Sequence, residues 1–96
     1  MKTKELVAIL TDNDEFLAFG NVAEKYSSRP DLHAFIFLNK FVPGDEDIVA
    51  AAEHDQIFLG VGLEELAEVI TPEQALDLSR CGVFVSRETD SLSMFV

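Results

Sequence analysis

Apolar residues recur at helical spacing in the first part of the chain. Leu6, Ile9 and Leu10 predict a short first helix. Asp12 and Glu15 then stand at capping-box spacing, which is typical of a helix start. The apolar residues that follow are three or four positions apart, so we expect a second helix with one apolar face: Phe16, Phe19, Ala23 and Tyr26.

The segment 31–41 is compatible with two structures. Its apolar run over residues 34–38 suits a buried strand, because aromatic and β-branched residues favour pleated surfaces. Ser28 and Asp31 at capping-box spacing, together with the stop signal Pro43-Gly44, favour a buried helix instead. On balance the helix is the better prediction, with the strand as the alternative.

Three further elements follow in the middle of the chain. The acidic run 45–47 predicts the first turn of a helix over residues 48–52, because the helix dipole favours carboxylates there. Residues 57–59 predict a short strand. Residues 63–70 predict an amphipathic helix whose glutamates face outward: Glu64, Glu65 and Glu68.

The clearest local signal begins at Thr71. Thr71 can cap a helix, Pro72 suits its first position, and Gln74 can complete the capping box. Gly82 suits the left-handed residue just past the end of that helix. Two apolar residues stand where a Schellman ending brings side chains into contact: Leu78 and Val83.

The last part of the chain predicts an antiparallel hairpin. Residues 83–86 and 92–96 alternate in polarity around a loop at 87–91. Because the second strand runs to residue 96, we expect it to be an exposed edge of the sheet. An unprotected edge invites pairing with another chain. We therefore expect a homo-oligomer, formed through this edge or through exposed phenylalanine surface.

Together these elements predict an α+β fold, in which several short helices pack on a small antiparallel sheet with a C-terminal β-hairpin. No repeat, linker or low-complexity tract divides the chain. Its 96 residues, 48% of them hydrophobic, suffice for one core. We expect a single globular domain over residues 1–96.

The charge of the chain is strongly one-sided. It has 18 acidic and 7 basic residues, a formal net charge of −11, and no Lys or Arg from Phe41 to Ser79. Direct binding to nucleic acid is not expected, because such affinity depends on Lys and Arg. The acidic surface either keeps the protein soluble or meets a basic partner. The candidate partner-binding residues are on predicted helices: Glu64, Glu65, Glu68, Glu73 and Asp77.

One segment has the outline of a dinucleotide-binding turn, since Gly60-Val61-Gly62 lies between a predicted strand and a predicted helix. The third glycine position is Glu65, however, and Glu64 stands beside it. These two carboxylates would occupy the positive helix end that phosphates need. We interpret the segment as a tight strand-to-helix turn and expect no cofactor.

Metal and catalytic motifs are not recognisable. Calcium loops counted from Asp12 or Asp45 lack the glycine and glutamate that such loops require. His33, His54 and Cys81 share no ligand spacing. Cys81 also stands at a predicted helix C-terminus, where the dipole disfavours a thiolate. We expect a buried, inert cysteine, no metal site and no enzymatic activity.

Targeting signals are not recognisable either. The lone cysteine permits no intramolecular disulfide. The first apolar run is too short for a secretory signal, and no stretch is long enough to span a bilayer. We expect a cytoplasmic protein without membrane contact.

Four segments of the second half carry a resemblance: AEHDQI (52–57), GLEELAE (62–68), RCGV (80–83) and SLSMFV (91–96). Through them, residues 53–96 resemble small acidic hypothetical proteins encoded by mobile gene cassettes of bacterial integrons. The resemblance covers a little under half of the chain and includes no motif of known chemistry. It implies a bacterial origin, a compact α+β domain and a tendency to form oligomers.

Two functions are compatible with the sequence. The leading hypothesis is a non-catalytic, oligomeric interaction module that presents an acidic surface to a basic protein. Its support is the base-free acidic stretch together with the lack of reaction chemistry. The alternative is a small-molecule binding domain, whose phenylalanine-lined pocket contains one or two acids and takes a cationic or aromatic ligand.

Overall fold

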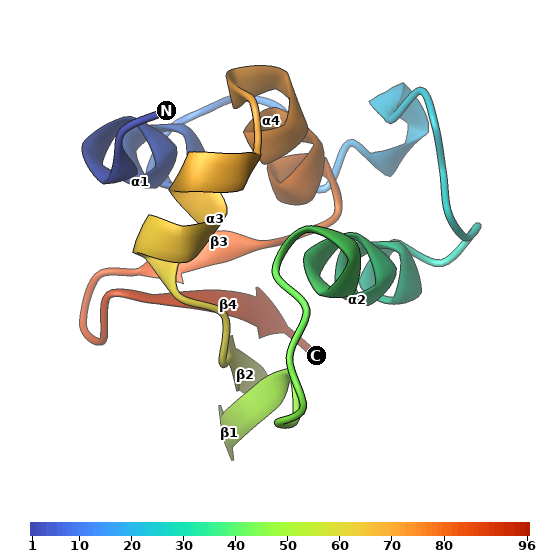
Figure 1. Ribbon diagram of the computed structural model, residues 1–96. Coiled ribbons are helices and arrows are strands. Elements are labelled where there is room, and N and C mark those ends of the chain that lie inside the picture. Colours follow the sequence, from blue (N-terminus) through green and yellow to red (C-terminus); the bar gives the residue numbers. More distant parts are fainter.

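The computed structural model describes residues 1–96 and has an α+β architecture, as the sequence predicts (Figure 1). The helices are α1 (Thr3–Thr11), α2 (Pro30–Phe41), α3 (Leu63–Val69) and α4 (Pro72–Arg80), with a short 3₁₀ turn, η1 (Phe19–Asn21). The strands are β1 (Val49–Glu53), β2 (Gln56–Leu59), β3 (Phe84–Ser86) and β4 (Ser91–Phe95). No helix is both long and apolar enough to cross a membrane.

The four strands form one antiparallel sheet in the order β1-β2-β4-β3. The predicted C-terminal hairpin is confirmed as the pair β3 and β4. The prediction that its second strand is a sheet edge is wrong, because β2 pairs with the other side of β4. The sheet edges are therefore β1 and β3.

Helices cover one side of this sheet. In Figure 1, α1, α3 and α4 lie above β3 and β4, α2 lies beside them, and β1 and β2 extend away from the helices. The core forms where the two layers meet, since burial of each large apolar side chain contributes roughly 1.5–3 kcal/mol. Leucines from both layers are among its fully buried residues: Leu6, Leu10, Leu38, Leu66, Leu78 and Leu92.

Both ends of α4 form as its sequence predicts. The Gln74 backbone N–H donates to Thr71 Oγ1 at 3.2 Å, and the Thr71 N–H donates to Gln74 Oε1 at 2.9 Å. At the other end, Gly82 has a φ of 97° and its N–H donates to the Ser79 carbonyl at 2.9 Å. The Val83 N–H donates to the Leu78 carbonyl at 3.0 Å, which completes a Schellman ending.

Two other predictions are confirmed and refined. Residues 31–41 belong to α2, so the helical alternative is the correct one. The strand predicted at 57–59 and the helix predicted at 63–70 correspond to β2 and α3, each with slightly different bounds.

The helix predicted to begin at Asp12 is wrong. This part of the chain is irregular apart from η1, and Phe16 and Tyr26 are each 39% exposed. The Asn13 side chain donates to the Ile9 carbonyl at 2.7 Å and so binds the last turn of α1. Its Oδ1 accepts the Glu15 N–H, also at 2.7 Å, in a local turn that competes with helical bonding.

The helix predicted over residues 48–52 is also wrong, because this segment forms β1. It folds back on β2 through a tight turn at His54 and Asp55, and Ala52 lies opposite Ile57. The alanines favour a helix by themselves. Pairing with the apolar strand β2 overrides that preference, as tertiary context often does.

Gly82 provides a test of the α4 ending. A Cβ at this position would lie 2.9 Å from Leu17 Cδ2, in addition to the cost of a left-handed backbone. We expect Gly82→Ala to lower the free energy of unfolding by about 2 kcal/mol, measured by urea denaturation. The control Gly20→Ala meets no atom within 4 Å and should change it by less than about 0.5 kcal/mol. Equal stabilities of the two variants would contradict this account.

Candidate functional site

Arg80 neutralises two of the acids that the sequence offers for partner binding. Its guanidinium lies 2.7 Å from Asp77 Oδ1 and 3.0 Å from Glu73 Oε1. It also lies 3.0 Å from Glu15 Oε1, in the irregular segment before α2. The hydrogen bonds that Arg80 donates to these carboxylates, to Asp77 first, raise the pKa of Arg80 above its ordinary value. Glu73 and Asp77 are therefore paired with Arg80 within α4 and are not free acidic groups.

The acids of α3 remain unpaired. Glu64, Glu65 and Glu68 are exposed, as the amphipathic pattern predicts, and the salt bridges of the chain all involve Arg80. The Glu65 carboxylate also fills the space over Gly62, where a Cβ would collide with it. The segment 60–62 does connect β2 to α3, so its interpretation as a strand-to-helix turn is confirmed.

More acids gather around this same connection. Gly60 and Val61 line a hollow of about 290 Å³ with the acids of the α2–β1 loop, and Gly62 and Leu63 line another of about 340 Å³. The Gly60 N–H donates to the Ile48 carbonyl at 2.6 Å and so fixes the loop against the connection. We name the six exposed carboxylates of the two hollows the acidic band: Asp45, Glu46, Asp47, Glu64, Glu65 and Asp90.

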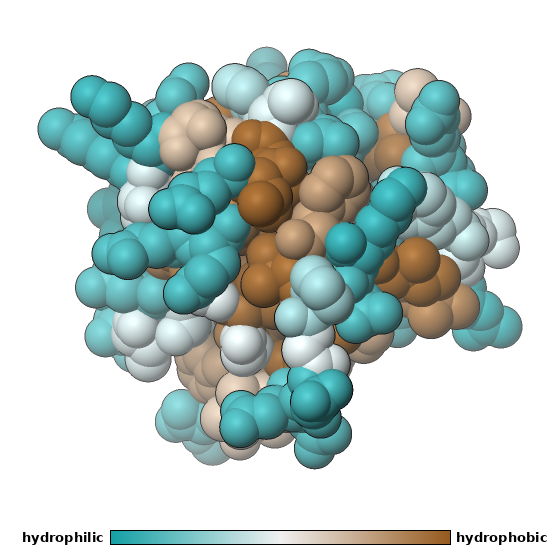
Figure 2. All heavy atoms as spheres, viewed as in Figure 1, coloured by the Kyte–Doolittle hydropathy of each residue, from teal (hydrophilic) through white to brown (hydrophobic).

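Apolar residues interrupt the acidic surface. Figure 2, viewed as Figure 1, shows hydrophobic residues in an irregular stripe between α3 and α2, with hydrophilic residues on either side. Large apolar side chains of these two helices are partly exposed: Leu32, Ile36 and Val69. Hydrophilic residues therefore border apolar surface and do not cover the whole of this face.

The residues best suited to catalysis are engaged in packing. His33 is 2% exposed, its ring stacks on Tyr26 at 5.1 Å between centroids, and its Nδ1 accepts the Tyr26 N–H at 3.0 Å. Cys81 is also 2% exposed, and burial raises the pKa of its thiol to about 12. The prediction of a buried cysteine is confirmed. His54 lies apart from both, in the exposed β1–β2 turn, and no cluster of His, Cys, Asp and Glu is arranged to hold a metal ion.

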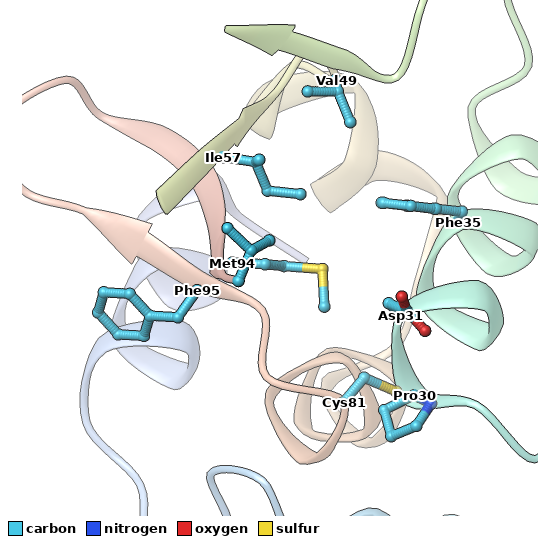
Figure 3. A pocket seen from close by; sticks show the side chains of 9 residues that line it. Pro30, Asp31, Phe35, Val49, Ile57, Cys81, Met94 and Phe95 are labelled. Carbon is cyan, nitrogen blue, oxygen red and sulfur yellow. The ribbon is translucent and has the colours of Figure 1, made fainter. Parts of the chain in front are cut away.

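An apolar cleft opens between α2 and the sheet, with a volume of about 500 Å³. In Figure 3, Phe35 of α2 faces Ile57 of β2 and Met94 of β4 across this opening, while the ring of Phe95 points away from it. The Asp31 carboxylate lies on the α2 side of the cleft. The sequence predicted an aromatic-lined pocket as an alternative but did not identify these residues, because the walls come from five separate segments.

Comparison of the chain with protein-family models, with curated proteins and with solved structures finds no match. The acidic band and the apolar cleft are therefore the features from which we infer a function.

His33 makes stability depend on pH. Burial lowers its pKa from the ordinary value of 6.5; the Asp77 charge opposes this effect and the Lys25 charge adds to it. Because the unfolded chain takes up the proton more readily, stability should fall as pH drops below 6.5 towards the folded-state pKa. We expect urea denaturation to show this loss between about pH 7.5 and about pH 5.5.

His33→Gln should remove most of that pH dependence, although the variant is less stable throughout. His54→Gln is the matched control and should retain the wild-type slope, because His54 is exposed. The assignment to His33 fails if the His33→Gln variant loses as much stability as the wild type over the same pH range.

Proposed function

We propose that this domain is a non-catalytic interaction module that binds a basic protein through its acidic band. The observation that carries the proposal is the set of six exposed carboxylates around the β2–α3 connection, none of which forms a salt bridge. In a chain with a net charge of −11, neighbouring unpaired carboxylates repel one another. A partner that brings Lys or Arg to the band relieves this repulsion.

Exposed, unpaired carboxylates of this kind favour association with a partner more than they favour folding. Charged patches steer oppositely charged partners and accelerate their encounter. The band combines the α2–β1 loop, which the Gly60–Ile48 hydrogen bond fixes, with the start of α3 and with Asp90 of the β3–β4 turn. Its carboxylates are therefore presented on a defined surface. The effect is screened by salt over roughly 8–10 Å, so binding should weaken as ionic strength rises.

The two residues with the most reactive side chains, Cys81 and His33, are engaged in packing, which supports a binding role over a catalytic one. The thiol of Cys81 is buried and protonated at neutral pH, and the His33 ring is committed to its contacts with Tyr26. Of the five acids selected from sequence, Glu64 and Glu65 belong to the band and Glu68 lies near them on α3. A cytoplasmic setting, in which a lone thiol stays reduced, is part of the same proposal.

Charge-matched variants test the band. The first removes five of its charges by Asp45→Asn, Glu46→Gln, Asp47→Asn, Glu64→Gln and Glu65→Gln. The second removes five exposed charges elsewhere by Glu5→Gln, Asp12→Asn, Asp14→Asn, Glu24→Gln and Asp55→Asn. Both have the same net charge, so only the position of the charge differs.

Each variant is used to capture basic proteins from a bacterial lysate, and captured proteins are then titrated in purified form. We expect the band variant to lose about tenfold or more in affinity, and the control variant less than about twofold. The affinity of the wild-type protein should decrease as the salt concentration is raised from about 50 to about 500 mM. Equal losses in both variants, or no loss in either, would refute the proposal.

Association between copies is a separate part of the proposed function. We infer that it uses β1, which is an edge strand with all five residues exposed and no charge from Val49 to Ala52. A long uncharged edge is prone to pair with another strand. A bulge between Val49 and Ala51 shortens the regular part of that edge but leaves Ala51 and Ala52 in register with β2.

Salt distinguishes this association from binding to a basic protein. Because each copy carries a net charge of −11, added salt should strengthen self-association, as light scattering would show by a rising mass. Ala51→Lys should block it, since lysine on an edge strand opposes pairing. A monomer mass at every salt concentration would exclude pairing through β1.

A further inference from the structure

The apolar cleft between α2 and the sheet has the dimensions of a small-molecule site. Its volume of about 500 Å³ lies in the range of roughly 300–1,000 Å³ that is typical of such pockets. It exceeds the other hollows of the molecule, and seven of its nine wall residues are hydrophobic. Apolar atoms of a ligand would leave water on entering it, which is favourable in proportion to the area buried.

Asp31 is the charged side chain on this wall. Its Oδ1 accepts the adjacent Leu32 N–H at 2.9 Å, and the carboxylate forms no salt bridge. Figure 3 shows it on the same side of the cleft as the Phe35 ring. A cationic group placed between the two would meet a carboxylate and the face of an aromatic ring, and both interactions favour positive charge.

We propose that the cleft binds a small amphiphilic amine, with its ammonium group at Asp31 and its apolar body against Phe35, Ile57 and Met94. The inference goes beyond the acidic band, which shares no residue with the cleft. An anionic ligand is disfavoured by Asp31 and by the net charge of −11. A neutral ligand would bury apolar surface but gain nothing from the carboxylate.

The other residues that line the cleft can accommodate the apolar part of a ligand in more than one shape. Met94 has a flexible, polarisable side chain that adapts to irregular surfaces. Cys81 lies beside Pro30 at the end of the cleft nearest α4 (Figure 3). Cys81 is 2% exposed and burial raises the pKa of its thiol to about 12, so it is a neutral packing group in the wall and not a nucleophile.

The test uses four probes at up to about 1 mM: n-hexylamine, n-hexanol, hexanoate and ethylamine. Hexylamine combines the charge with the apolar chain, and each of the others lacks the positive charge or most of the apolar surface. We expect hexylamine to raise the melting temperature and to bind about tenfold more tightly than hexanol. Hexanoate and ethylamine should give no saturable binding.

Two aspartate variants test whether the ammonium group of the ligand binds at Asp31. Asp31→Asn should reduce hexylamine affinity about tenfold, to the level of hexanol, and leave hexanol binding unchanged. Asp14→Asn removes the same charge outside the cleft and should have no effect beyond about twofold. The site is reported by NMR, where the Met94 methyl signal should shift on titration and the Met1 methyl signal should not.

The inference is overturned if hexylamine and hexanol bind wild type equally, if neither binds, or if the two aspartate variants behave alike. A shift of both methyl signals, or of neither, would also overturn it. The proposed function stands or falls separately, because charge-matched variants of the acidic band leave Asp31 unchanged.

Discussion

The pairing of β2 with β4 joins the two halves of the sheet, and the arrangement of the molecule follows from it. Ile57 lies opposite Met94, and Leu59 lies opposite Leu92. Because side chains alternate across a sheet, this register turns both pairs toward the helical layer. A shift by one residue would direct Phe58 inward instead and would remove the cleft wall opposite α2. The same pairing places β4 inside the sheet and leaves β1 and β3 as its two edge strands.

Arg80 has a place in the fold that composition does not show. Arg80 is 11% exposed and binds two acids of α4 together with Glu15, which lies 65 residues earlier. The interaction attaches the irregular segment before α2 to the helical layer. With this arginine engaged, the acids around the β2–α3 connection lack a cation of their own. The Arg80 cluster thus separates the carboxylates that form salt bridges from those that remain unpaired.

Local signals predicted local structure well. The Thr71 cap and the Gly82 ending depend on atoms within a few residues, and both formed as expected. The segment after Asp12 satisfied helical spacing but folds otherwise, because its partners are distant. The Leu17 N–H donates to the Ser79 carbonyl, and the Tyr26 N–H donates to His33. No periodicity within the segment contains that information.

The reactivity of Cys81 can report on motion of the helices that border the cleft. It is the sole cysteine of the chain, and it is enclosed where the end of α4 meets Pro30 at the start of α2. A thiol reagent gains access only when these elements separate, so its rate of reaction measures how often they do. The native sequence therefore contains an internal probe of breathing between α2 and the rest of the molecule, which needs no added label.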